Sequence, residues 1–398
     1  MKTRFPMRVP TRFIVVAALA AMLLVAAACS GSDNSGGDTS VEGLPPEFQR
    51  LSEVWELMKQ EHIDAEGLDP QVIADGAIRG MVSALDDPYA AFLDQEQYSL
   101  ESQDILGFFG GIGAEVGIRE GVITILAPMP DTPAEAAGVK PGDVILEVDG
   151  ESIQGLNLLA VVRLIRGDQG TTVTLLLRHL RDTEPVSIEI EREIIQLESV
   201  HLLMQVGRIG HLRISSFTGT TGDELKDAIE RFERSQGVGL VVDLRNNPGG
   251  LVSSVVEVTS QFIDDGLVLY QVDANGNRDD WGVQSGGKAL DIPMVVLVNE
   301  FSASASEVFS GAIIDHERAT IIGTTTFGKG SVNQLWPLDG GSGILFTTAR
   351  WFTPNGLLIE GEGITPDIVL DPLEDDEDDD IHLEQAIEIL KEEISRGG

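Results

Sequence analysis

Apolar residues recur at helical spacing near both ends of the chain. Residues 48–60 and 70–85 carry an apolar side chain at about every third or fourth position, which is the period of an amphipathic helix. The same spacing returns in residues 383–394. We therefore predict a small helical region over residues 47–104 and a last helix that docks on the body of the protein.

The pattern changes at residue 107 to short β-rich runs separated by glycine turns. Strands are predicted at Ile112–Ile118, Val122–Leu126, Val144–Val148, Thr172–Leu177 and Val186–Ile190. Helical character is confined to Pro133–Ala137 and Leu158–Ile165. Short strands with two helices in so few residues predict one compact α+β module over residues 105–192.

Residues 193–371 alternate buried strands with helices. Strand patterns lie at Gly210–Ile214, Gly239–Leu244, Pro293–Val298 and Thr320–Ile322. Helical patterns lie at Gly222–Ser235, Val252–Phe262 and Ser304–Asp315. This alternation predicts an α/β core. Residues 374–380 are all acidic and are interpreted as a solvated spacer rather than a metal-binding tail, so residues 372–398 are expected to form a spacer and the last helix.

The first 46 residues have the pattern of an export signal followed by a tether. Four basic residues and no acidic one precede Asp33, and an apolar run covers residues 13–28. A basic start with about 16 apolar residues fits a secretory signal over residues 1–28 better than a membrane span. Residues 29–46 are rich in Gly, Ser and Asp, which predicts a flexible linker.

Cys29 ends a run of small residues that resembles a bacterial lipoprotein box, in which the cysteine carries the lipid. Ala26 departs from that pattern, because leucine is more usual there. The alternatives are an uncleaved membrane anchor and a small-residue cleavage site with an incidental cysteine. All three place the body outside the cytoplasm, and the lipoprotein interpretation predicts a membrane-anchored protein of a bacterial cell envelope.

The composition and net charge of the chain exclude several classes of function and site. The chain has 398 residues, 42% of them hydrophobic, which suits two or three globular domains. Its 27 basic and 65 acidic side chains give a net charge of −38, so phosphate backbones are repelled and we expect no nucleic-acid binding. The single cysteine excludes an intrachain disulfide and a zinc site built on cysteines.

Candidate chemistry lies between Asp243 and Asn333. A predicted strand ends in a turn with Gly249 and Gly250, where glycines let a substrate approach the backbone and point N–H groups at an anion. Serine and alanine alternate just after the next strand, and Lys329 lies between two glycines. A serine nucleophile needs a base, and a lysine can act as one where its pocket keeps it neutral. A Ser/Lys pair is one option from the residues alone.

The middle module resembles a bacterial PDZ domain. The resemblance rests on residues 110–113, on the run Pro133–Ile145 and on Val148–Gly150. It implies that an extended chain end binds as an added strand at a sheet edge. The backbone N–H groups expected to receive its carboxylate belong to Gly110, Gly111, Ile112 and Gly113. The alternative is a module that only packs against the core.

Residues 47–393 together resemble the carboxyl-terminal processing proteases of the S41 family, the tail-specific Ser/Lys peptidases of bacteria and chloroplasts. The resemblance rests on Ser-Ala-Ser-Ala-Ser-Glu at 302–307 and Phe-Gly-Lys-Gly at 327–330. It implies Ser304 as the nucleophile and Lys329 as the general base, with no metal or cofactor. The implied oxyanion donors are Ala305, Gly249 and Gly250, and Glu307 matches an auxiliary acid. The implied fold is an α/β core related to the ClpP/crotonase type, with an inserted PDZ domain and a helical N-terminal region.

Two departures from the family pattern concern the site. Family members often carry a glutamine four residues after the lysine, where this chain has Asn333, so the orienting amide is either Asn333 or, across a one-residue bulge, Gln334. The segment Leu85–Tyr89 also departs from the usual Leu-Asp-Pro-His-Ser, and we expect no effect of this on the chemistry.

The resemblance predicts a serine endopeptidase that captures C-terminal or unfolded segments of envelope proteins with its PDZ domain. Its partners would be peptide and protein substrates, a regulatory partner protein and the membrane, through the N-terminal anchor. The alternatives are a non-catalytic peptide-binding scaffold and a hydrolase of non-peptide acyl substrates. The sequence leaves the oligomeric state open.

Overall fold

The computed structural model describes residues 45–119, 121–180, 182–370 and 380–397. The predicted signal sequence, Cys29, nearly all of the linker and residues 371–379 of the acidic spacer lie outside these ranges. The chain divides into two compact units, Met1–Pro70 and Gln71–Gly398. Across the described ranges, no helix combines the length and apolar character needed to cross a bilayer.

The described part of the first unit is helical, as the apolar spacing predicts. It holds the 3-10 turns η1 (Pro46–Phe48) and η2 (Ala65–Gly67) on either side of α2 (Gln49–Glu61). No residue of α2 is buried, and its apolar Val54 and Leu57 are exposed. α3 (Pro70–Ser83) starts at the boundary and belongs mainly to the second unit.

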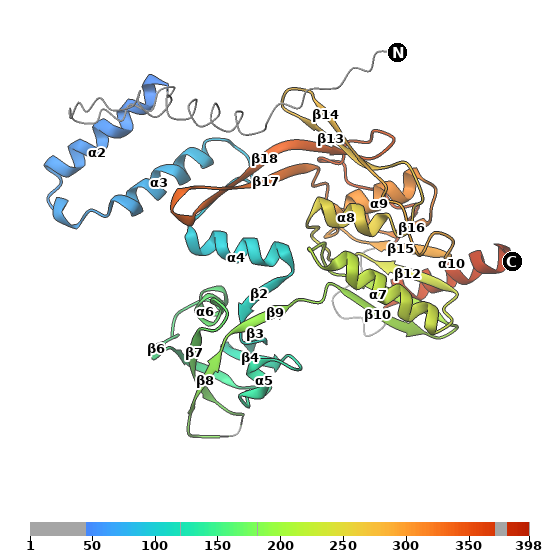
Figure 1. Ribbon diagram of the computed structural model, residues 1–398, viewed down its shortest axis with the longest axis horizontal. Coiled ribbons are helices and arrows are strands. Elements are labelled where there is room, and N and C mark those ends of the chain that lie inside the picture. The colour runs from blue at the N-terminus through green and yellow to red at the C-terminus, as the bar shows by residue number, and fades with distance from the viewer. Residues whose placement is uncertain (1–44, 120, 181, 371–379, 398) are drawn as a thin grey trace, which may run out of the picture. The chain divides into compact units, whose positions relative to one another are not determined.

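The middle module is a strand-rich domain with its own core (Figure 1). Its sheet has the order β3-β4-β5-β7-β8, and β6 pairs with β5. These strands are β3 (Ala114–Arg119), β4 (Val122–Pro128), β5 (Val144–Val148), β6 (Glu151–Ser152), β7 (Thr172–Arg178) and β8 (Val186–Glu191). The helices are α5 (Pro133–Ala136) and α6 (Leu158–Ile165), close to the predicted bounds.

A two-stranded ribbon joins this module to the rest of the second unit. β2 (Phe108–Gly111) pairs antiparallel with β9 (Glu193–Gln196), so the chain enters and leaves the module along neighbouring strands. α4 (Gln95–Leu106) precedes the ribbon. This connection is that of a domain inserted into a continuing chain.

The core sheet has six strands in the order β10-β11-β12-β15-β16-β19, and only β10 runs antiparallel to its neighbour. The strands are β10 (Val200–Gln205), β11 (Ile209–Ile214), β12 (Gly239–Asp243), β15 (Met294–Val298), β16 (Thr320–Gly323) and β19 (Ile368–Val369). Three helices, α7 (Thr221–Arg234), α8 (Val252–Thr259) and α9 (Ala305–Asp315), share one hydrophobic cluster with the sheet.

The last helix, α10 (Ile381–Gly397), covers the other face of this sheet, as predicted. Alternate residues of one strand separate the two faces: Val242 packs with the cluster of α7–α9, and Val241 packs with Ala386 and Leu390 of α10. Every residue of β12 and β15 is buried, which is typical of parallel strands covered on both sides.

A second sheet, which the apolar pattern of the sequence does not predict, is antiparallel and has the order β1-β18-β13-β14, with β17 also paired to β18. Its strands are β1 (Ala91–Leu93), β13 (Leu267–Asp273), β14 (Arg278–Gly282), β17 (Ser331–Pro337) and β18 (Gly343–Phe352), and η3 (Asp339–Gly341) joins β17 to β18. β17 begins two residues after Lys329, so this sheet helps to position the predicted base.

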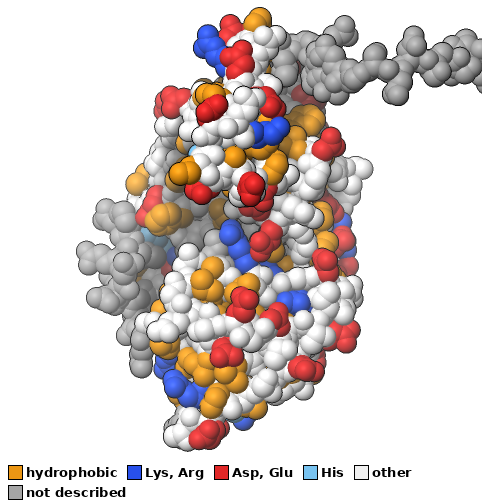
Figure 2. All heavy atoms as spheres, turned by 90° about the vertical axis from the view of Figure 1, so that its left-hand side faces the viewer, with side chains coloured by type: hydrophobic (Ala, Val, Ile, Leu, Met, Phe, Trp, Pro, Cys, Tyr) orange, Lys and Arg blue, Asp and Glu red, His pale blue; other side chains and the backbone are white. Residues whose placement is uncertain are grey.

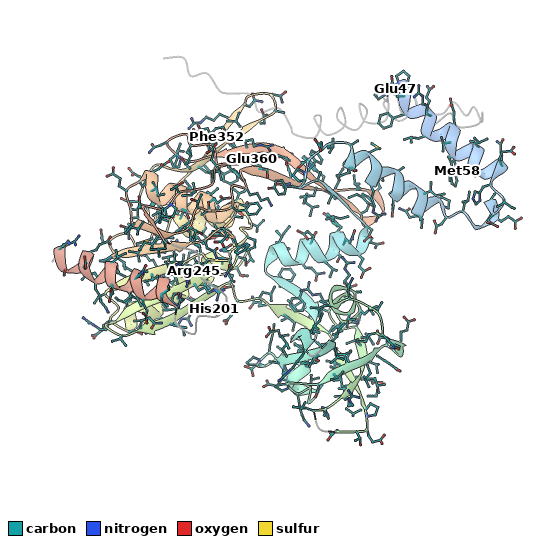
Figure 3. All side chains as sticks on the ribbon, turned by 180° about the vertical axis from the view of Figure 1, so that it is seen from behind. Glu47, Met58, His201, Arg245, Phe352 and Glu360 are labelled. Carbon is teal, nitrogen blue, oxygen red and sulfur yellow. The ribbon has the colours of Figure 1, made fainter. Side chains whose placement is uncertain are left out.

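Arg245 ties the start of α10 to the end of β12 (Figure 3). Its guanidinium donates to Asp243 Oδ2 and to Asp380 Oδ2, at 2.7 Å in each case, and His211 Nε2 lies 2.9 Å from Asp243 Oδ2. Burial alone would raise the pKa of Asp243, but the bonds from His211 and Arg245 outweigh it and hold this pKa well below its usual range. Asp243 and Arg245 therefore have structural partners that hold the turn.

Acidic side chains are spread over the face shown in Figure 2 and do not gather in one patch. This distribution fits a chain with 65 acidic residues. Such a surface favours solubility and does not identify a ligand.

Candidate active site

Ser304 lies at the junction of the core sheet and α9. β15 ends at Val298, and Ser304 is the N-cap residue of the helix. Its backbone has φ 55° and ψ −113°, a conformation that L residues rarely adopt and that costs about 1–3 kcal/mol. Strain of this kind collects at functional sites, and helix N-termini favour developing negative charge.

The two neighbouring serines serve the fold. Ser302 Oγ donates to the carbonyl of Leu244 at 2.8 Å, and Ser306 Oγ donates to the carbonyl of Asn247 at 2.9 Å. Both residues are fully buried, whereas Ser304 is partly exposed. Of the three serines in the motif, Ser304 is therefore the one placed to meet a substrate.

The glycine turn after β12 packs directly against Ser304. A Cβ atom on Gly249, which has φ 104°, would lie 2.8 Å from Ser304 Cβ and 2.9 Å from the amide nitrogen of Ala305. A side chain there would force the turn away from Ser304. The glycine turn and the serine motif are therefore in direct contact, and the role of the turn as an oxyanion site stays a prediction.

The three predicted oxyanion donors differ in what their N–H groups already do. The amide of Gly249 donates to Asn247 Oδ1 at 2.9 Å, so it is engaged. The bridge between Phe217 and Gly250 uses the neighbours of Gly250 and leaves its amide without an acceptor in the described chain. Ala305 is the first residue of α9 and has no intrahelical acceptor. The geometry therefore favours Ala305 and Gly250 as donors.

Glu307 joins the serine motif to the lysine motif. It is fully buried, and its Oε2 accepts the backbone N–H groups of Ser304 and Lys329, both at 2.8 Å. Its Oε1 accepts the amide of Gly328 and the hydroxyl of Thr326, both at 2.6 Å. One carboxylate thus fixes the backbone of both predicted catalytic residues, a more central place than the predicted auxiliary role.

Replacing Glu307 with glutamine is expected to lower the free energy of unfolding by about 2–4 kcal/mol and to reduce activity at least tenfold. In either orientation, the glutamine amide turns its NH₂ group toward two of the four groups that donate to Glu307. Those two donors lose their acceptor, and each unsatisfied buried group costs about 1–3 kcal/mol. Denaturant unfolding and initial cleavage rates measure the two effects. Glu362→Gln, the same change at an exposed position, is the control, and equal stability of the two variants would contradict the prediction.

Tyr89, which lies far upstream of Lys329 in the sequence, contacts the predicted base. Lys329 Nζ lies 4.7 Å from the centroid of the Tyr89 ring. We expected no effect of the departure at Leu85–Tyr89 on the chemistry, and that expectation stays untested, but the structure places Tyr89 of this segment against Lys329. Periodicity cannot reveal a contact between residues so far apart in sequence.

Asn333 and Gln334 lie at a bulge in β17, where the register with β18 shifts between Val332 and Asn333. Asn333 is half-buried, its Nδ2 donates to the carbonyl of Tyr89 at 3.5 Å, and its Oδ1 is buried with no partner in the described chain. Gln334 is exposed. This placement favours Asn333 over Gln334 as the orienting amide.

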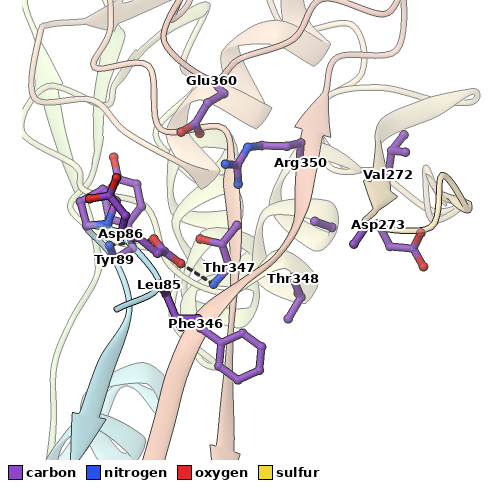
Figure 4. A pocket seen from close by; sticks show the side chains of 14 residues that line it. Leu85, Asp86, Tyr89, Val272, Asp273, Phe346, Thr347, Thr348, Arg350 and Glu360 are labelled. Carbon is purple, nitrogen blue, oxygen red and sulfur yellow. Dashed lines mark hydrogen bonds between the residues drawn. The ribbon is translucent and has the colours of Figure 1, made fainter. Parts of the chain in front are cut away.

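A cavity of about 560 Å³ lies beside Tyr89 (Figure 4). Tyr89, Thr347, Arg350 and Glu360 line it. Glu360 also packs against the segment of the base, since a Cβ on Gly330 would lie 2.2 Å from the Glu360 amide nitrogen. Neither Ser304 nor Lys329 is among the residues that line this cavity, which adjoins the lysine segment through Tyr89 and Glu360.

The middle module has an apolar groove of about 230 Å³ between β3 and α6. Gly111, Ile112, Gly113, Val116, Val162 and Ile165 are among its lining residues. Gly110 is not part of the lining, because its amide donates to Gln103 Oε1 at 3.0 Å and a Cβ there would lie 2.1 Å from the Gly167 carbonyl oxygen. The groove has the place and character of a peptide site at a sheet edge.

Three family models match the chain. Peptidase family S41 matches residues 208–370, the PDZ domain matches residues 124–179, and the activating protease CtpB N-terminal domain matches residues 20–97.

Curated relatives of the chain are named as carboxy-terminal processing or CtpA-like serine proteases. The carboxy-terminal processing protease CtpA of Bacillus subtilis is 37% identical over 340 residues, 85% of this chain and 72% of that protein. The carboxy-terminal-processing protease of Bartonella bacilliformis is 36% identical over 367 residues, 90% and 82% of the two chains. The probable CtpA-like serine protease of Staphylococcus aureus is 37% identical over 328 residues, and the chain spans 65% of its length.

A solved structure from Bacteroides fragilis, named as an S41 protease, shares the fold at a TM-score of 0.50 and 16% identity, covering 85% of this chain and 97% of that one. The family models agree with the order of parts in the structure, with the PDZ module inserted ahead of the α/β core. The chain therefore belongs to the carboxy-terminal processing serine proteases of peptidase family S41, with a PDZ domain.

Proposed function

We propose that this chain is a serine endopeptidase of a bacterial cell envelope that cleaves captured C-terminal or unfolded segments with Ser304 and Lys329. One observation carries the proposal: Glu307 accepts the backbone N–H groups of both residues while the glycine turn packs against Ser304. The export pattern and Cys29 support an envelope location with a lipid anchor. The parallel sheet covered by helices supports a relation to the ClpP/crotonase-type fold.

The reaction follows from the groups at the site. Neutral Lys329 takes the proton of Ser304 Oγ, which attacks the substrate carbonyl carbon. The N–H groups of Ala305 and Gly250 stabilise the oxyanion, and the lysine ammonium then protonates the leaving amine. Water hydrolyses the acyl-enzyme with the lysine again as base. Asn333, on the next strand, orients the lysine.

Labelling with a fluorophosphonate tests the proposal. The full-length protein is incubated with the probe, digested and sequenced by mass spectrometry, and a parallel sample receives an unfolded casein with and without a chelator. We expect one adduct, on Ser304, and loss of casein cleavage in step with labelling. An adduct on another serine would overturn the assignment, and neither adduct nor cleavage would support the scaffold alternative.

Replacing Val162 with glutamate is expected to raise KM for an unfolded protein at least tenfold while kcat changes little. The half-buried Val162 lines the PDZ groove, so the new carboxylate meets the apolar residues and the carboxylate of a bound chain end. Leu164→Glu, on the same helix but exposed and outside the groove, is the control. Equal KM values for the two variants would show that the groove does not capture substrate.

A further inference from the structure

The segment that carries Tyr89 is fixed to the second sheet at two points. β1 pairs with β18, and Asp87 bridges the loop to the same strand. Asp87 Oδ1 accepts the Tyr89 amide at 3.0 Å, and Oδ2 accepts the Thr347 amide at 2.9 Å (Figure 4). Burial raises the pKa of Asp87, but these backbone bonds outweigh it and leave the pKa below its ordinary value. Tyr89 is thus held in a defined place.

Tyr89 meets two groups of the proposed mechanism at once. Its ring lies under Lys329 Nζ, and its carbonyl oxygen accepts from Asn333 Nδ2. The second contact fixes which end of the Asn333 amide faces Tyr89 and leaves Oδ1 as the free acceptor. A residue that touches both the base and its orienting amide is placed to set their geometry.

The ring of Tyr89 remains a neutral π surface at the pH of catalysis. Burial raises the pKa of the Tyr89 phenol, and the charges of Glu360, Glu307 and Asp87 act in the same direction, whereas Arg350 opposes them. A neutral aromatic face attracts an ammonium group and gives no comparable attraction to a neutral amine.

We propose that Tyr89 is a positioning residue for Lys329, whose ring stabilises the ammonium that forms when Ser304 Oγ transfers its proton to Lys329 Nζ. This inference rests on the proposed function of Ser304 and Lys329. The proton that leaves the serine is the one gained by the lysine, so the positive charge develops beside the ring during acylation. The interaction therefore stabilises the transition state more than the ground state, in which the lysine is neutral.

The test measures kcat and KM for labelled casein on the alkaline plateau of the pH–rate profile, where the rate no longer rises with pH. Tyr89→Leu, which removes the π face, is expected to lower kcat about 3- to 30-fold with little change in KM. Tyr89→Phe, which keeps the face, is expected to retain most of the activity. Tyr270→Leu is the matched control, because its ring contacts Arg278 and stacks on Phe352 in the same sheet and neither residue belongs to the proposed mechanism; we expect its kcat to equal that of the wild type.

A second series covers the case in which Tyr89→Leu fails to fold. Phenylalanine at position 89 is replaced by its mono-, di- and trifluoro analogues, which keep the shape of the ring and weaken its attraction for cations. A stepwise fall in kcat with fluorination supports the proposal. A flat series, or equal losses in Tyr89→Phe and Tyr89→Leu, would overturn it, while a wild-type enzyme not labelled at Ser304 would instead overturn the proposed function.

Discussion

Replacing Ser304 with alanine is expected to reduce kcat/KM for an unfolded protein by on the order of 10⁴-fold or more, because no nucleophile remains to form the acyl-enzyme. The fold should persist, since Glu307 binds the backbone N–H of residue 304 and alanine retains it. The measurement compares initial rates of casein cleavage at equal concentrations of folded enzyme, with circular dichroism as the check on folding.

Ser254→Ala is the matched control for this variant. Ser254 is buried in α8, and its hydroxyl has no hydrogen-bond partner in the part of the chain that is described. We expect its activity to equal that of the wild type. Undiminished cleavage by Ser304→Ala would remove Ser304 from the mechanism.

Replacing Lys329 with arginine is expected to lower kcat/KM by on the order of 10³-fold. Arginine keeps the positive charge, the cation–π contact and the backbone bond to Glu307, but its guanidinium stays protonated and cannot accept a proton. Loss of general-base catalysis costs about 10²- to 10⁴-fold. The variant therefore separates the role of a base from that of a fixed charge.

Rates across a range of pH, together with fluorophosphonate labelling of Ser304, measure this loss. Lys288→Arg serves as the control, because Lys288 forms a surface ion pair with Glu230 and lies on a loop that the mechanism does not use. Activity of Lys329→Arg close to that of the wild type would show that Lys329 contributes charge alone.

The helices and strands around the site were predictable where their apolar residues form a continuous run or a regular face. β12 and β15 are continuous apolar runs, and α7 has a regular apolar face, so their positions follow from the sequence to within a few residues. β18 is ten residues long, and most of its side chains are half-buried, so neither alternation nor a continuous apolar run marks it. A strand of this kind is identified by its partners, which sequence spacing does not contain.

The residues of the candidate site likewise differ in whether the sequence predicts them. Ser304, Lys329 and Glu307 lie in two short motifs, and the resemblance brings them together. Tyr89 precedes the motifs by more than 200 residues and reaches Lys329 only through the pairing of β1 with β18 and the bridge made by Asp87. The engagement of the Gly249 amide by Asn247 is equally invisible in the sequence, because it depends on the shape of one turn.

The backbone of Ser304 sets two requirements against each other. With φ 55° and ψ −113°, the position suits glycine better than any residue with a side chain, yet the proposed mechanism needs a hydroxyl there. The strain must be offset by the surrounding contacts, chiefly those of Glu307 and the glycine turn. Replacing Ser304 with glycine would relieve the strain and remove the hydroxyl, so stability and the proposed activity are expected to oppose each other at this residue.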